Sequence, residues 1–127
     1  MSEVYITKSS KFLPNNPISN DEMENMLGLI NDETSKARRI VLRNNGIKNR
    51  FYAIDEKGNP THSNADLTYL AIKGLFDDQF TSQNVELLSC GTSTPDLLLP
   101  SHAAMVHGLL QNRSVELNSS SVIKPNL

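Results

Sequence analysis

The chain has 127 residues and a formal net charge of −2, with 38% hydrophobic and 20% charged residues. This composition is typical of a globular domain and excludes disordered and collagen-like proteins, and the charge argues against a chain that binds nucleic acid or anionic membranes. Its single cysteine, Cys90, cannot form an internal disulfide and suits the reducing cytoplasm. The start of the chain does not have the pattern of a secretory signal, and no apolar run approaches the roughly 20 residues that cross a bilayer.

Alternating helix and strand patterns run through most of the chain. The expected elements, in chain order, are a strand over 4–8, a helix over 19–30, a helix over 35–44, a strand over 48–55, a helix from 63, a strand over 85–90, a helix over 101–111 and a strand over 114–118. Ser19 with Glu22, and Ser63 with Asp66, have the spacing of helix N-terminal capping pairs, and Gly46 is suited to a helix stop. This alternation predicts an α/β fold with a partly parallel sheet.

The helix from residue 63 has the clearest apolar stripe. The residues of this stripe are Leu67, Leu70, Ala71, Gly74 and Leu75. Their spacing places them on one side of a helix, so we expect that side to face the core.

Six of the twelve basic residues fall between Lys36 and Arg50, without an intervening acidic residue. One interpretation is a surface that meets phosphate, because arginine geometry suits oxyanions. The other is a solvated helix face that happens to be basic. The residues alone leave both interpretations open.

A second informative stretch is the polar loop from Gly91 to Ser101, which follows the expected strand over 85–90. Binding sites in α/β folds gather at the carboxyl ends of strands. Cys90 closes the apolar strand before this loop, and we interpret it as a buried, structural thiol. His102 and His107 are five residues apart, about 140° around a helix, so they make a poor metal-binding pair, and we expect no metal site and no bound cofactor.

Two motifs resemble the beta-ketoacyl-ACP synthase III family of condensing enzymes. The stretch from Gly46 to Arg50 after a basic helix is similar to the family's T-G-I-x-x-R step, and the stretch from Gly91 to Ser101 is similar to its A-T-S-T-P-D-x-x-x-P-S loop. The resemblance extends over residues 3–120 in the same order. We therefore expect residues 1–121 to form the N-terminal part of the thiolase-like layered αβαβα fold, incomplete, with 122–127 as an unmatched tail.

The resemblance implies an acyltransferase of fatty acid or polyketide biosynthesis. Such enzymes load an acyl primer from acyl-CoA or acyl-ACP onto a cysteine and condense it with malonyl units on acyl carrier protein, as homodimers in which a side chain before the P-S pair enters the partner's acyl tunnel. That position is Leu99 here. Arg43 and Arg50 are the candidate contacts for phosphate or coenzyme A.

The sequence departs from the family pattern at two places. Ile40 and Asn44 occupy the positions of the family's Trp and Arg, which stack on adenine, and neither side chain stacks a ring in that way. This departure resembles divergent relatives that make resorcinol-type products. The family's nucleophilic cysteine would fall near Ser121, and its later histidine and asparagine would fall beyond Leu127.

From these departures we expect a fragment of a condensing enzyme that is inactive alone, with no catalytic residue of its own. The alternative is a non-catalytic docking or binding module that retains the half-fold. Uncovered strand edges and apolar layers argue against a stable isolated half-fold.

Overall fold

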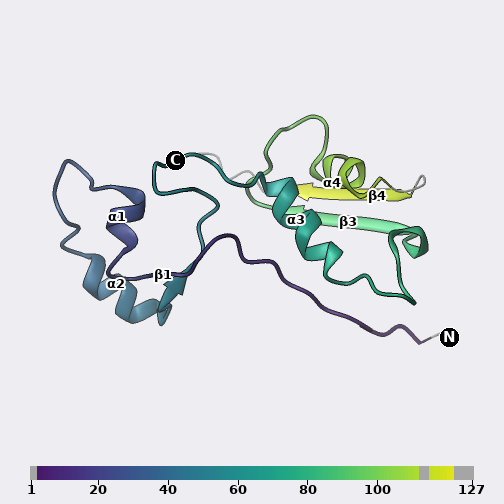
Figure 1. Ribbon diagram of the computed structural model, residues 1–127, viewed down its shortest axis with the longest axis horizontal. Coiled ribbons are helices and arrows are strands. Elements are labelled where there is room, and N and C mark those ends of the chain that lie inside the picture. Colours follow the sequence, from purple (N-terminus) through teal and green to yellow (C-terminus); the bar gives the residue numbers. More distant parts are fainter. Residues whose placement is uncertain (1–2, 112–114, 122–127) are drawn as a thin grey trace. The chain divides into compact units, whose positions relative to one another are not determined.

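A computed structural model describes residues 3–111 and 115–121, and the expected tail at 122–127 lies outside these residues. The chain forms two compact units, one made of Met1–Phe12 with Ser63–Leu127 and the other of Leu13–His62 (Figure 1). Each unit has its own helices and its own pair of strands, and each is described by itself below.

The Leu13–His62 unit contains two short helices and a small antiparallel strand pair. Helix α1 spans Met23–Leu27 and helix α2 spans Arg38–Asn45. Strand β1 (Ile18–Ser19) pairs with strand β2 (Asn49–Arg50), so the predicted strand over 48–55 is regular for two residues only.

Both helices begin later than predicted, and α1 also ends earlier. The Glu22 carboxylate accepts hydrogen bonds from the Ser19 amide (3.0 Å) and hydroxyl (2.6 Å), and the Ser19 oxygen accepts one from the Glu22 amide (3.4 Å). The predicted pair therefore forms, but α1 begins at Met23 with Glu22 before it, so Ser19 does not cap the helix. Gly28 has a positive φ of 83°, which ends α1 before Ile30. Gly46 is left-handed (φ 67°) and ends α2, as expected.

The second unit is built around a parallel strand–helix–strand arrangement. Strand β3 (Leu87–Thr92) leads through a loop to helix α4 (His102–Leu110) and then to strand β4 (Glu116–Ser121), which runs parallel to β3. Helix α3 (Asn64–Lys73) and the short 3-10 helix η1 (Ser82–Asn84) come before this arrangement. The predicted parallel pairing and the helix over 101–111 are therefore confirmed.

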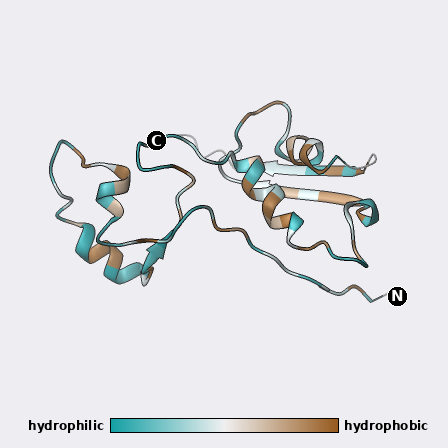
Figure 2. Ribbon diagram, in the orientation of Figure 1, coloured by the Kyte–Doolittle hydropathy of each residue, from teal (hydrophilic) through white to brown (hydrophobic). Residues whose placement is uncertain are grey.

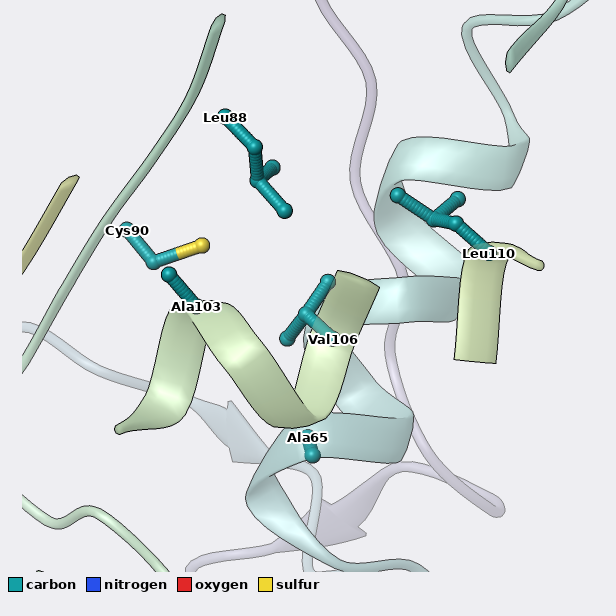
Figure 3. Close-up of a cluster of buried hydrophobic side chains, with 6 residues drawn as sticks. All are labelled: Ala65, Leu88, Cys90, Ala103, Val106 and Leu110. Atoms are coloured by element: carbon teal, nitrogen blue, oxygen red, sulfur yellow. The ribbon is translucent and has the colours of Figure 1, made fainter. Parts of the chain in front are cut away.

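A small hydrophobic core lies between the two strands and helices α3 and α4 (Figure 3). Its buried members are Ala65, Leu88, Cys90, Ala103, Val106 and Leu110. Burial alternates along β3, with Leu88 and Cys90 inward and Leu87 exposed. The described residues therefore cover one face of this strand, whereas parallel sheets are normally covered on both.

Helix α3 presents a different side to this core than its sequence stripe predicts. The α3-side residues that lie in or against the core are Ala65, Tyr69, Ile72 and Phe76, not the expected stripe. The prediction of the face is therefore wrong, because a second set of apolar residues shares the helix and α4 packs against that set. The predicted capping box of Ser63 and Asp66 is present in full.

The N-terminal segment lies against the second unit without forming the strand predicted over 4–8. A strand needs a neighbour to accept its hydrogen bonds, and no described strand pairs with this segment; Val4 and Ile6 are almost fully exposed. The segment is held instead by an ion pair from Lys8 to Asp77, and the Lys8 ammonium lies 5.5 Å from the centre of the Phe80 ring. The hydrogen bond from Lys8, with two backbone amides, lowers the pKa of Asp77 to about 2.

Hydrophobic residues follow β3 along much of its length, whereas α2 is largely hydrophilic (Figure 2). Among the described residues, no helix has the length and apolar character that a membrane crossing needs.

The core position of Leu88 leads to a stability prediction. We expect Leu88→Ala to lower the free energy of unfolding by about 2–5 kcal/mol, because the buried side chain would leave a cavity under α4. The matched control is Leu98→Ala, which removes the same atoms from a side chain that is 73% exposed and should cost about 0.5 kcal/mol or less. Urea unfolding of the two variants beside the parent chain measures both values, and equal losses would contradict the assigned core.

Candidate functional site

The carboxyl ends of β3 and β4 meet at one edge, where Thr92 is opposite Ser121 in the register. The polar loop over 91–100 leaves from this edge and ends at Ser101, which caps α4 by accepting a hydrogen bond from the Ala104 amide (3.3 Å). Ligands of parallel α/β folds bind outside the carboxyl ends of the strands. This edge is therefore the first candidate site.

Asp96 fastens the loop to the first turn of α3. Its two carboxylate oxygens accept hydrogen bonds from the backbone amides of Asn64 (2.7 Å) and Ala65 (2.8 Å). The Asn64 side chain donates in turn to the Thr92 hydroxyl (2.9 Å) and to the Thr94 carbonyl. A carboxylate that accepts hydrogen bonds from the first amides of a helix stabilises the helix start, so Asp96 holds the loop in place.

The three leucines that follow Asp96 project into solvent. Leu97, Leu98 and Leu99 are 53%, 73% and 84% exposed. Leu99 therefore makes little contact with the described residues. The assignment of Leu99 to an acyl tunnel stays a prediction.

Cys90 is part of the core and faces the helix layer, beside Ala103 (Figure 3). It is a free thiol, and burial raises its pKa. A raised pKa keeps the sulfur in the protonated, weakly nucleophilic form at neutral pH. Cys90 is thus positioned as a structural residue.

His102 is buried at the start of α4 and is 3% exposed. The Thr68 hydroxyl donates its proton to the Asn64 carbonyl (3.0 Å), so the His102 Nε2–H must donate to the Thr68 oxygen (3.0 Å). The other ring nitrogen, Nδ1, has no partner among the residues that the structure describes. Within the same residues, no three His, Cys, Asp or Glu side chains gather in a way that would hold a metal ion.

The second candidate site is a basic pocket in the Leu13–His62 unit, with a volume of about 500 Å³. It is lined by Asn20, Asp21, Arg38, Arg39, Leu42, Arg43, Gly46, Ile47 and Lys48. The turn at Gly46 brings Lys48 back towards the side of α2 that carries Arg39 and Arg43. The basic cluster of the sequence is therefore gathered in part around one concave surface.

The structure separates the predicted phosphate contacts in this region. Arg43 lines the basic pocket. Arg50 is partly buried and donates to the Asn20 side chain, which itself lines the pocket. Ile40 and Asn44 do not line it, and Ile40 is 59% exposed.

Sequence reasoning missed Asp96, Asn64 and Arg39 as individual residues. The partners of Asp96 lie about thirty residues earlier in the chain, and nothing in the local sequence marks that pairing. Arg39 could have been predicted to lie beside Arg43, because it comes four residues earlier and residues at that spacing share a helix face.

No family model matches the sequence. The chain is 34% identical over 110 residues to a beta-ketoacyl-[acyl-carrier-protein] synthase III of Bordetella petrii, a match of 87% of this chain to 32% of that protein. The chain therefore spans about a third of the length of this curated relative.

Solved structures show the same partial coverage. The tetronic acid condensing enzyme AbyA1 is similar with a TM-score of 0.68 and 27% identity, over 89% of this chain and 32% of that one. A 3-oxoacyl-[acyl-carrier-protein] synthase III from Aquifex aeolicus has a TM-score of 0.66 at 22% identity, over 90% of this chain and 33% of that one, and supports the fold alone.

The hydrogen bonds of Asp96 lead to a prediction for the loop. We expect Asp96→Asn to lower the free energy of unfolding by about 1 kcal/mol, because one amide would lose its acceptor and the charge at the α3 N-terminus would be lost. Asp78→Asn removes an exposed carboxylate from the same unit and should change stability by less than about 0.5 kcal/mol. Thermal or urea unfolding compares the two, and an equal effect would show that the charge, and not the contact, is responsible.

The environment of Cys90 leads to a second prediction. In the folded chain at pH 8 we expect iodoacetamide to modify Cys90 at least about tenfold more slowly than in denaturant, because burial raises the thiol pKa and blocks access. Intact-mass measurement over time gives both rates. Equal rates would show that the thiol is accessible.

Proposed function

We propose that this chain, which resembles the N-terminal part of the beta-ketoacyl-ACP synthase III family and has the corresponding part of the thiolase-like fold, forms one portion of an acyl-condensing enzyme. The whole enzyme would condense an acyl primer with a malonyl unit on acyl carrier protein, in fatty acid or polyketide biosynthesis. Its partners would be acyl carrier protein and either acyl-CoA or acyl-ACP. The whole enzyme would form a homodimer and would act in the reducing cytoplasm.

The observation that carries this proposal is the conformation of the loop over 91–100. The stretch that most resembles the family motif is the one that Asp96 clasps to α3 at the carboxyl edge of the parallel strands. With Asp96 bonded to α3, the Leu99 side chain stays on the exposed side of the loop. An exposed apolar side chain on an anchored loop is suited to entering the acyl tunnel of a second subunit.

In this proposal the chain supplies binding surface and not the reacting groups. Cys90 is the chain's only cysteine, and it lies in the core at the middle of β3, where burial raises its pKa. The nucleophile and the groups that assist decarboxylation would come from residues outside this sequence. The isolated chain would therefore not catalyse condensation.

A second function, a non-catalytic docking module, is favoured by one observation. The exposed leucines at 97–99 form an apolar stretch with no covering residue among those described. Such a stretch suits a permanent partner as well as a tunnel. Analytical ultracentrifugation separates the two functions, because a docking module should be a stable compact monomer without partners, and a portion of an enzyme should self-associate.

A chimera tests the condensing function. The 110 matched residues of the Bordetella petrii synthase are replaced by their counterparts from this chain, and condensation of acyl-CoA with malonyl-ACP is measured. We expect the chimera to be active, and its Cys90→Ser variant to keep at least about half of that activity, because Cys90 is structural. The isolated chain, incubated with acyl-CoA, should show no thioester by intact mass.

Two results would contradict this assignment. A folded chimera without activity would show that this chain does not supply a competent N-terminal portion. An acyl adduct on Cys90 of the isolated chain would show that this thiol is a nucleophile after all.

A further inference from the structure

The turn that ends α2 contains the only asparagine of the chain that is followed by glycine. Asn45 is the last residue of the helix, and Gly46 comes directly after it with a left-handed φ of 67°. Both residues are exposed, and a Cβ built on Gly46 would meet no atom within 4 Å. The backbone at this step is therefore open to water and is not crowded by a neighbouring side chain.

A hydrogen bond folds the Asn45 side chain over this turn. Its Oδ1 accepts from the Ile47 amide at 2.9 Å. A backbone amide can only donate, so the side-chain oxygen, and not the side-chain nitrogen, must face it. The Ile47 carbonyl accepts in turn from the Asn20 side chain at 2.9 Å, which holds the backbone of the turn in place. The ring that the Asn45 bond closes encloses the Gly46 peptide, as in other turns of this kind.

We propose that Asn45 is a site of spontaneous deamidation, a modification in which water replaces ammonia. In the first step the Gly46 backbone nitrogen loses its proton to hydroxide and bonds to the side-chain carbonyl carbon of Asn45. The Asn45 Nδ2 takes up a proton from water and leaves as ammonia, and a cyclic imide remains. Water then opens the imide, giving aspartate if the new C–N bond breaks and isoaspartate if the original backbone C–N bond breaks. One water enters and one ammonia leaves, so the step needs no oxidant or reductant.

Three features of the turn favour the first step. Negative charge develops on Oδ1 as the new bond forms, and the Ile47 amide already donates to that atom, in the manner of an oxyanion hole. Gly46 has no side chain to obstruct the approach of its nitrogen to the Asn45 carbon. The attack also requires rotation of the Asn45 ψ angle, which opens only the final turn of a helix that ends at this residue.

The modification would alter the basic pocket, because Gly46 and Ile47 line it. Either product adds a negative charge beside this pocket, at the end of α2 where the helix already carries partial negative charge. Isoaspartate also adds a carbon to the backbone, which shifts Gly46 away from the end of α2 and moves the Ile47 carbonyl from its Asn20 donor. The turn therefore contains a one-way chemical change in the charge and shape of the pocket.

Incubation of the full 127-residue chain at pH 8, followed by cleavage after lysine and mass spectrometry of the 37–48 peptide, measures the reaction. Replacement of the amide by a carboxyl group raises the peptide mass, fragmentation locates the change, and chromatography separates the aspartate and isoaspartate forms. We expect Asn45 to react at least about tenfold faster than Asn44 in the same peptide, because Asn44 lies inside α2 and precedes a residue with a side chain. The rate should rise with pH, because hydroxide removes the proton of the Gly46 amide.

The same chain in denaturant is the reference for the folded turn, and we expect folded Asn45 to react at least as fast as denatured Asn45. The matched control is Asn45→Gln, whose longer side chain would have to close a less favourable ring and should stay unmodified. A lower rate in the folded chain, equal rates at Asn44 and Asn45, or an equal mass increase in Asn45→Gln would overturn the proposal. The result is independent of the chimera, because it measures a change within the chain and not condensation.

Discussion

The hydrogen bonds between the Asp96 carboxylate and the first amides of α3 determine where the loop over 91–100 lies. The Asn64 side chain donates a hydrogen bond to the Thr92 hydroxyl at the end of β3. The Asn64 carbonyl accepts one from Thr68, whose hydroxyl is also hydrogen-bonded to His102 at the start of α4. Two helices and a strand thus meet at one small polar cluster. Because these groups are largely satisfied by one another, the loop holds a defined shape beside the strand ends.

The parallel pair of strands explains both the core and the exposed apolar surface. A helix must connect parallel strands, and α4 does so while covering Leu88 and Cys90. Leu87, on the opposite side of β3, is 54% exposed. In the solved relatives two thirds of the chain lies outside the matched region, and a second layer on this face is what a parallel sheet ordinarily has.

Local signals in the sequence correctly predicted the stop of α2, the cap of α3 and the strand–helix–strand order, whereas both ends of α1 and the long-range contacts were not predicted. Gly46 and the Ser63–Asp66 pair act on residues beside them, so their effects could be read directly. The buried face of α3 could not be predicted, because that helix carries two sets of apolar residues and the packing of α4 determines which set is buried. The strand predicted over 4–8 failed for the related reason that β-structure depends on a neighbour. Of the candidate sites, the basic cluster could be predicted from the sequence. Which of its arginines forms an ion pair could not, because Arg38 pairs with Glu24 through the folding of α1 against α2, whereas Arg39 has no ion pair among the residues that the structure describes.

The clasp at α3 also bears on the order in which the protein becomes structured during its synthesis. Asp96 is translated 32 residues after Asn64, whose amide it caps. At roughly 5–20 residues per second the ribosome needs about two to six seconds to add that stretch. Over that interval the nascent helix has its Ser63 cap but lacks the Asp96 carboxylate, so the amides of Asn64 and Ala65 can bond only to water until the loop has been made.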